Sequence, residues 1–206
     1  MHQTRKEASR LLPIRKKGSK YIVRASSNLQ TGIPIVIAVR DILKLAKTAK
    51  EVRKMIILKE LKLNGRNVRD SKESMSLFNI LEADKPYILS LLPTKKFTLV
   101  PTKEKNRTCK VINKKLIPGN RIQLNLHDGS NVITKDKINV EDSVSINSEG
   151  KIVSHTAFEK GKSCFIMSGK YMGFNAKITS VNGKEVNVDI KDKGDVKLNA
   201  SQLIII

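Results

Sequence analysis

The sequence predicts an α+β chain of several small domains: a pair of short helices with a β-hairpin, then a central all-β domain, then a C-terminal β-barrel. Apolar residues recur at three- and four-residue spacing over residues 40–57. From residue 86 onwards they alternate with polar residues in short runs that turn dipeptides separate. Only 4% of the 206 residues are aromatic and Trp is absent, which favours several small aliphatic cores over one large core.

Residues 1–36 are predicted to be a basic N-terminal arm. Its first 24 residues hold eight basic residues and one acidic residue, and Pro13 and Gly18 interrupt them. Such a segment alone buries too little apolar surface to offset the entropy lost on ordering. We therefore expect the arm to become ordered on its partner. The alternative is a disordered, solvated tail.

Residues 37–83 are predicted to form a helix-helix-hairpin module. Thr48 and Glu51 fit a capping box, so we expect two short helices that meet near Thr48 rather than one long helix. Asn64-Gly65 is a strong signal for a hairpin turn after them. One apolar stripe is expected along the helices, made of Ile42, Leu45, Ala46, Ala49, Val52 and Ile56.

Residues 84–157 are predicted to form the central all-β domain. Apolar and polar residues alternate over residues 122–126, and Asp128-Gly129 then supplies a turn. Further strands are expected at residues 132–133, 139–146 and 152–153.

Residues 158–206 are predicted to form a second small β domain, a barrel. Asn182-Gly183 marks a hairpin turn within it, and the loop SGKYMGFN contains Gly169 and Gly173, which permit tight backbone conformations. Its strands are expected at residues 165–167, 176–181, 186–190, 196–198 and 203–206.

Positive charge is concentrated in the first 121 residues. The net charge is +7 over residues 1–24, +7 over 40–69, −2 over 70–92, +8 over 93–121 and +1 over 122–206, and every Arg lies between Arg5 and Arg121. A cationic front beside a near-neutral back favours a polyanionic partner, nucleic acid first. An anionic membrane is the weaker candidate, because the sequence has no long basic amphipathic helix with Trp or Phe on its apolar face. A merely soluble basic surface is the remaining alternative.

Catalytic and metal chemistry find little support in the sequence. Cys109 and Cys164 lie in no CxxC or Cys/His pattern, so we expect them to pack as small apolar residues and expect no zinc site, disulfide or cofactor. His127-Asp128 stands at a strand end before Gly, which favours a turn. No apolar run approaches the ~20 residues that span a bilayer, and no signal peptide is evident, so a cytoplasmic location is expected.

Four segments in a fixed order carry a family resemblance: PIRKKGSKYIVR; IPIVIAVRDILKLAKTAKEVRKMI with LNGRNVRD; NRIQLNLHDGSN; and FEKGKSCFIMSGKYMGFNAKI. Together they resemble the archaeal and eukaryotic small-subunit ribosomal protein four of the e type. The resemblance implies that the second segment is an RNA-binding module shared with bacterial ribosomal protein four and several RNA-modifying enzymes. It also implies that the last segment is a KOW-type motif that opens an SH3-like barrel.

The sequence departs from that family in three places. Lys59 stands where the family commonly has Gly, so the helix end before the hairpin is expected to close differently or with strain. The pair of glycines in the KOW-like loop is reduced, with Ser168 before Gly169 and Asn175 after Phe174. Whether this loop contacts RNA is therefore left open. The chain is shorter than most relatives and lacks the basic tail of the eukaryotic ones, which favours an archaeal source.

The resemblance implies a non-catalytic constituent of the small ribosomal subunit. Its partners would be small-subunit ribosomal RNA, bound chiefly through backbone charge and shape, and neighbouring ribosomal proteins, with no membrane and no small-molecule substrate. One alternative is an RNA-modifying enzyme, which needs a separate catalytic domain for which the predicted segments leave no room. Another is a KOW-containing transcription or translation factor that uses the barrel to bind protein.

The candidate RNA-binding residues are the basic residues of the arm, of the module and of a third patch after it. They are Arg5, Arg10, Arg15, Lys16, Lys17, Lys20 and Arg24; Arg40, Lys44, Lys47, Lys50, Arg53, Lys54, Arg66 and Arg69; and Lys95, Lys96, Arg107 and Lys110.

Overall fold

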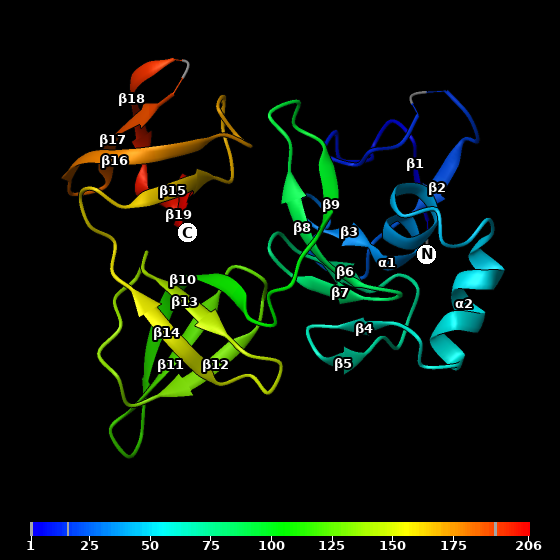
Figure 1. Cartoon of the computed structure of the whole chain (residues 1–206), viewed down its shortest axis with the longest axis horizontal. Coiled ribbons are helices and arrows are strands. Elements are labelled where there is room, and N and C mark those ends of the chain that lie inside the picture. The colour runs from blue at the N-terminus through cyan, green and yellow to red at the C-terminus, as the bar shows by residue number, and fades with distance from the viewer. Residues whose placement is uncertain (1, 16, 192) are drawn as a thin grey trace. The chain divides into compact units, whose positions relative to one another are not determined.

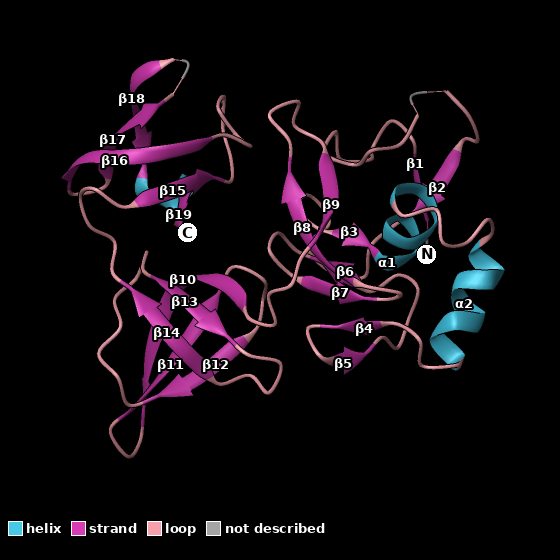
Figure 2. Ribbon diagram, in the orientation of Figure 1, coloured by secondary structure: helices cyan, strands magenta, loops and turns pink. Residues whose placement is uncertain are grey.

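The structure is a computed structural model that describes residues 2–15, 17–191 and 193–206. It divides into two compact units, unit 1 (residues 1–105) and unit 2 (residues 106–206). Strands make up most of the regular structure (Figure 1), and both α-helices belong to unit 1 (Figure 2). No helix of the described residues is long and apolar enough to cross a membrane.

Unit 1 is built around a five-stranded sheet of order β5-β4-β7-β8-β9. Two short two-stranded sheets, β1-β2 and β3-β6, accompany it. In chain order the elements of unit 1 are β1 (His2–Thr4), β2 (Tyr21–Val23), β3 (Ile33–Pro34), α1 (Ile35–Ile37), the π-helical turn η1 (Ala38–Ile42), α2 (Ala49–Ile57), β4 (Lys62–Leu63), β5 (Arg66–Asn67), β6 (Ser74–Met75), β7 (Ile80–Glu82), β8 (Pro86–Leu91) and β9 (Phe97–Pro101).

The predicted boundary between residues 83 and 84 does not follow the strand pairing. β8 pairs with β7, with Ile80 opposite Ile88, so the β8-β9 hairpin extends the sheet of the module instead of opening the central domain. Leu81, Leu89 and Leu99 are buried in this sheet, which gives the hairpin its apolar partner. By strand pairing, the change of domain falls after β9 and before β10 (Arg107–Ile117).

The arm is ordered against unit 1, contrary to our expectation that it would order only on a partner. β1 pairs antiparallel with β2, with Gln3 opposite Ile22. Leu12 is only 2% exposed, and the backbone carbonyl of Leu11 accepts a hydrogen bond of 2.9 Å from the N–H of Phe97. Burial of this leucine supplies the apolar contact that the composition of the arm seemed to lack.

The capping box is confirmed, but the first helix lies earlier than predicted. Thr48 Oγ1 accepts from the N–H of Glu51 at 3.2 Å, and Glu51 Oε2 accepts from the N–H of Thr48 at 3.4 Å, so α2 begins where expected. The first helical segment covers α1 and η1, residues 35–42, because the apolar run there is fully buried. Leu45 of the predicted stripe is 39% exposed and follows that segment.

The end of α2 shows what the departure at Lys59 does to the backbone. Lys59 adopts φ +59°, the left-handed conformation that glycine adopts most readily. Its N–H donates to the carbonyl of Ile56 and the N–H of Glu60 donates to that of Met55, both at 3.0 Å, which is the Schellman pattern. The hairpin follows as predicted, with Asn64-Gly65 turning β4 into β5.

Unit 2 contains two five-stranded antiparallel sheets, of orders β12-β11-β10-β13-β14 and β18-β17-β16-β15-β19. Each encloses its own core of small aliphatic residues. In chain order its elements are β10 (Arg107–Ile117), β11 (Arg121–Leu126), β12 (Asn131–Thr134), β13 (Ser143–Ile146), β14 (Ile152–Thr156), β15 (Ser163–Ile166), β16 (Asn175–Asn182), β17 (Glu185–Ile190), β18 (Gly194–Asn199), the 3-10 turn η2 (Ala200–Gln202) and β19 (Leu203–Ile205).

Most strands predicted in unit 2 are present, with two differences. The longest strand, β10, was not foreseen, because its burial does not alternate: residues 109–111 are buried in succession and residues 112–116 are exposed in succession. Residues 139–142 are a loop and not the start of β13: Asp142 Oδ2 accepts from the N–H of Asn139 at 2.9 Å, and Glu141 has φ +76°. A carboxylate that caps a backbone N–H stabilises a turn at the expense of a strand.

Candidate nucleic-acid interface

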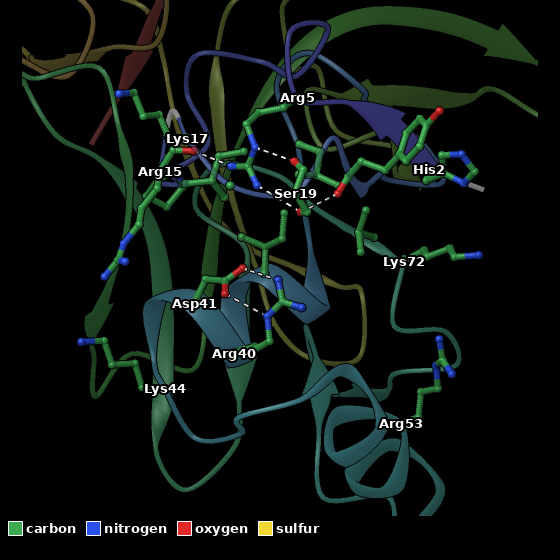
Figure 3. A pocket seen from close by; sticks show the side chains of 17 residues that line it. His2, Arg5, Arg15, Lys17, Ser19, Arg40, Asp41, Lys44, Arg53 and Lys72 are labelled. Atoms are coloured by element: carbon green, nitrogen blue, oxygen red, sulfur yellow. Dashed lines mark hydrogen bonds and ion pairs between the residues drawn. The ribbon is translucent and has the colours of Figure 1, made fainter.

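A basic groove of about 1030 Å³ lies in unit 1 between the arm and the helices (Figure 3). Its walls come from β1, β2 and the connection between them on one side, and from α1, η1 and α2 on the other. Asp41 is the acidic residue among its described lining. Its basic lining residues are Arg5, Arg15, Lys17, Arg40, Lys44, Arg53 and Lys72.

Asp41 is paired within this first groove. Arg40 Nε donates to Asp41 Oδ1 at 2.8 Å and its Nη2 donates to Oδ2 at 2.7 Å, a bidentate pair visible in Figure 3. This hydrogen bonding raises the pKa of Arg40. The carboxylate therefore neutralises Arg40 and leaves the charges of the other six basic residues for a ligand.

A second basic groove, of about 1050 Å³, lies in unit 1 where the arm meets the turn between β8 and β9. No acidic residue is among its described lining. Its basic lining residues are Arg5, Lys6, Arg10, Arg15, Lys20, Lys95 and Lys96.

Arg5 holds the arm in shape between the two grooves. Its guanidinium donates to the backbone carbonyl of Ser19 at 2.9 Å, to Ser19 Oγ at 3.3 Å and to the carbonyl of Arg15 (Figure 3). All three acceptors are neutral, so these bonds fix the side chain without cancelling its charge. Arg5 is thus both a structural residue and a positive centre.

Lys96 fastens the arm from the other side. Its ammonium donates to the carbonyl of Leu12 at 3.1 Å and to that of Arg10. The side chain bridges the β8-β9 turn and the arm, which are far apart in the sequence. Residues 95–96 therefore belong with the arm surface rather than with a separate third patch.

The remaining predicted residues of unit 1 are not among the described lining of the two grooves. Lys47, Lys50 and Lys54 are exposed before or along α2. Arg66 pairs with Glu73, whose Oε2 also accepts from the N–H of Arg69 at 3.2 Å, so part of the charge of the hairpin is neutralised. The rest are Arg24, which is half-buried after β2, and Lys16, which lies outside the described residues.

Arg107 and Lys110 must be removed from the predicted interface, because both side chains are buried in unit 2. Arg107 Nη2 lies 3.3 Å from Asp128 Oδ2, and the two side chains are 12% and 2% exposed. Lys110 is 2% exposed as a whole, and its ammonium donates to the carbonyls of Ala200 at 2.6 Å and Leu203 at 2.7 Å.

Lys110 also pairs with Glu141, and burial lowers its pKa while this hydrogen bond opposes the shift. Because the carbonyls belong to η2 and β19 and the lysine to β10, the side chain joins the two sheets of unit 2. A hydrogen bond of 3.0 Å from the N–H of Ile205 to Ser143 Oγ supports the same junction. A lysine with its donors used in this way cannot reach a phosphate.

Among the described lining residues that can carry a positive charge, three were not predicted: His2, Lys6 and Lys72. Lys6 adjoins Arg5 in the arm and could have been included on charge alone. Lys72 lies in the stretch of net negative charge, residues 70–92, so the charge pattern concealed it. Its position in the first groove depends on the fold.

Unit 1 carries 24 basic and 9 acidic residues, a net charge of +15, whereas unit 2 carries 16 and 10, a net charge of +6. The described residues contain no cluster of three or more His, Cys, Asp or Glu side chains that could hold a metal ion. His127-Asp128 forms a turn as predicted, in which Asp128 Oδ1 accepts from the N–H of Ser130 at 2.9 Å. The basic surface of unit 1 is therefore the best candidate site.

Comparisons with known proteins identify the family of the chain. A model of the ribosomal family S4e matches residues 83–153, and a KOW motif matches residues 160–190. The small ribosomal subunit protein eS4 of Methanococcus maripaludis is 34% identical, over 85% of this chain and 79% of that protein. The chain belongs to the ribosomal family S4e.

A second S4e relative, the small ribosomal subunit protein eS4 of Methanothermobacter thermautotrophicus, is 33% identical over 82% of this chain and 74% of that protein. The crystal structure of the 30S ribosomal protein S4e from Thermoplasma acidophilum has a TM-score of 0.73, at 24% identity over 86% of this chain and 95% of that one. This S4e chain therefore shares the fold of that protein, and its family is the one that the four sequence segments indicated.

Proposed function

We propose that this chain is a structural, non-catalytic constituent of the small ribosomal subunit and binds small-subunit ribosomal RNA through the basic surface of unit 1. The observation that carries the proposal is the pair of basic grooves beside the arm, in a chain whose relatives are named as small ribosomal subunit proteins. Its site of action is then the ribosome, in the cytoplasm.

Contacts with phosphate provide most of the affinity. Lys and Arg side chains that neutralise RNA phosphates displace the counterions of those phosphates, so the logarithm of the binding constant falls with that of the salt concentration by about 0.7–0.9 per phosphate contact. Arg15 and Arg53 add the planar, bidentate donors that suit phosphate oxygens. These contacts position the protein by shape and backbone charge, not by base sequence.

We further propose different binding partners for different parts of the chain. Residues 35–67, with α2 and the β4-β5 hairpin, would act with the arm as the RNA-binding module. The barrel of residues 158–206 would contact a neighbouring ribosomal protein, because its own surface adds little net charge. The described basic residues of the interface are Arg5, Arg10, Arg15, Lys17, Lys20, Arg24, Arg40, Lys44, Lys47, Lys50, Arg53, Lys54, Arg66, Arg69, Lys95 and Lys96, together with Lys6 and Lys72.

Sedimentation of cell extract through a sucrose gradient, followed by mass spectrometry of the fractions, tests the assignment. We expect stoichiometric amounts of the chain in the small-subunit peak after a wash at moderate salt. Confinement to the light fractions would contradict the proposal and favour an RNA-modifying accessory or a translation factor.

A further inference from the structure

The two basic grooves of unit 1 share one wall, the arm. Five residues line both grooves: Arg5, Ile14, Arg15, Gly18 and Ser19. We call the described residues 13–15 and 17–19 the arm loop. One groove therefore lies on each side of the arm loop, and the loop together with Arg5 separates them.

The outer walls of the grooves come from different elements. The first groove is closed by α1, η1 and α2, through Ile37, Arg40 and Arg53 among others. The second is closed by the β8-β9 turn, through residues 94–96. An extended RNA strand that follows one groove would have to cross the arm loop to enter the other.

Each groove has its own set of basic residues besides the shared Arg5 and Arg15. The first set is Lys17, Arg40, Lys44, Arg53 and Lys72, and the second is Lys6, Arg10, Lys20, Lys95 and Lys96. Arg40 is neutralised by Asp41, so each side keeps four or five positive charges that form no ion pair with another described residue and can meet phosphates.

Hydrogen bonds from Arg5 and Lys96 fix the backbone of the arm loop between the two grooves. Arg5 bonds to carbonyl oxygens of Arg15 and Ser19 on the loop, and Lys96 bonds to the carbonyl of Leu12 just before it. Gly18 has φ +144°, and a Cβ there would lie 2.8 Å from Arg5 Nη2. Glycine at this position lets the loop backbone pack directly against the guanidinium.

We propose that the arm loop inserts between two separate segments of RNA backbone, one in each groove, and that Arg5 provides positive charge at the shared wall. This inference rests on the proposed function and specifies its ligand: two phosphate backbones brought together by the arm, rather than one. The protein would then fasten two parts of the ribosomal RNA to each other.

The test uses the full chain and transcribed small-subunit ribosomal RNA, with hydroxyl-radical footprinting at low salt. The variant of the first groove combines Lys17→Gln, Arg53→Gln and Lys72→Gln. That of the second groove combines Lys6→Gln, Arg10→Gln and Lys20→Gln. A control removes the same charge from unit 2, as Lys135→Gln, Lys137→Gln and Lys160→Gln. The six groove side chains make no described hydrogen bond within the protein, and circular dichroism melting verifies the fold of each variant.

We expect the wild-type chain to protect two separate RNA segments, the first variant to lose one of them and the second variant to lose the other. The salt slope should fall by about 2–3 in each groove variant and stay unchanged in the control. The inference would be overturned if both variants lost protection of the same RNA segment, or if one of them lost protection of neither segment. Either outcome would leave RNA binding itself intact. A wild-type chain that protects no RNA would instead contradict the proposed function itself.

Discussion

Two lysines, one in each unit, make the same kind of bond but end in opposite surroundings. Lys96 in unit 1 and Lys110 in unit 2 each donate to two backbone carbonyls. Lys110 is almost fully buried and pairs with Glu141. Lys96 lines an open groove, and among the described residues it forms no ion pair.

The difference separates two uses of positive charge. In unit 1 Arg5 and Lys96 hold the arm through neutral acceptors, so this surface keeps the positive charge that we propose binds RNA. In unit 2 Arg107 and Lys110 are matched by carboxylates inside the protein, so they stabilise the fold and add nothing to the interface. Counting charge along the sequence cannot distinguish these cases, because both lysines lie in the segment of highest net charge, residues 93–121.

Truncation of Lys110 should have the largest effect, because it tests whether this positive charge stabilises the fold or binds RNA. Lys110→Ala leaves the Glu141 carboxylate and two carbonyls without their partner, which typically destabilises by about 3–5 kcal/mol. We expect a matching loss in the unfolding free energy of unit 2, measured by hydrogen exchange of its peptides. At low temperature, where the variant stays folded, the salt slope of RNA binding should be unchanged.

Lys115→Ala is the matched control, since Lys115 lies on the same strand, is exposed, and its side chain makes no described hydrogen bond. It should leave the exchange of unit 2 unchanged. If Lys110→Ala instead lowered the salt slope and spared stability, the lysine would be an RNA contact after all.

Arg5→Lys tests the corresponding role in unit 1. It keeps the positive charge but removes the several N–H donors of the guanidinium. The ammonium cannot hold Arg15 and Ser19 at once with the same geometry, so the arm loop should loosen. At about 1 kcal/mol per lost hydrogen bond, we expect affinity for ribosomal RNA to fall about fivefold to tenfold, with faster exchange of arm amides. Unchanged affinity with a loosened arm would show that the position of the loop does not matter for binding.

Pattern and turn chemistry were enough to predict much of the fold. The capping box at Thr48, the Asn64-Gly65 hairpin and the alternation over residues 122–126 are local signals, and each is found in the structure. The pairing of β8 with β7 is local, with Glu82 opposite Pro86, but nothing in residues 86–101 indicates that they join this sheet rather than the next domain. The run at residues 35–39 was equally ambiguous, since a short, fully buried apolar segment has no polar face to show its period.

The candidate site was predictable in composition and not in arrangement. The arm and module residues were identified from charge, whereas their division into two grooves depends on the arm folding back through Leu12 and Lys96. Burial of Arg107 and Lys110 depends on contacts with Asp128 and with the last strand, which are distant in the sequence.

A pH effect should distinguish unit 2 from unit 1, because both cysteines lie in unit 2 and are buried. Burial raises the pKa of Cys109 from 9.0 to about 12, and the nearby Asp128 carboxylate adds to the shift. The unfolded chain loses this proton above pH 9 while the folded chain keeps it, so this thiol makes stability fall as pH rises from 9 towards 12, by about 1.4 kcal/mol per pH unit. Below pH 9 it contributes no dependence.

The measurement is the difference between the wild type and Cys109→Ala in urea unfolding from pH 8 to pH 11. The variant should be less stable below pH 9, because it leaves a small cavity, but its stability should decline less steeply above pH 9, so that the difference from the wild type shrinks as the pH rises. Parallel curves would show that the thiol ionises equally in both states. Amide hydrogen exchange of unit 1 peptides, measured at the same pH values, serves as the internal reference, because unit 1 contains neither cysteine.

The smallest expected effect is a gain in stability, confined to unit 1. Lys59→Gly relieves a left-handed residue at the Schellman end of α2 and should stabilise unit 1 by about 0.5–1 kcal/mol, after the greater freedom of glycine in the unfolded chain is counted. Lys59→Ala removes the same charge but keeps the strained backbone, so it is the matched control and should bring no gain. Because Lys59 lines neither groove, both variants should bind ribosomal RNA with nearly the wild-type salt slope. A loss of slope as large as that of the groove variants would mean that general charge on unit 1, rather than the two grooves, holds the RNA.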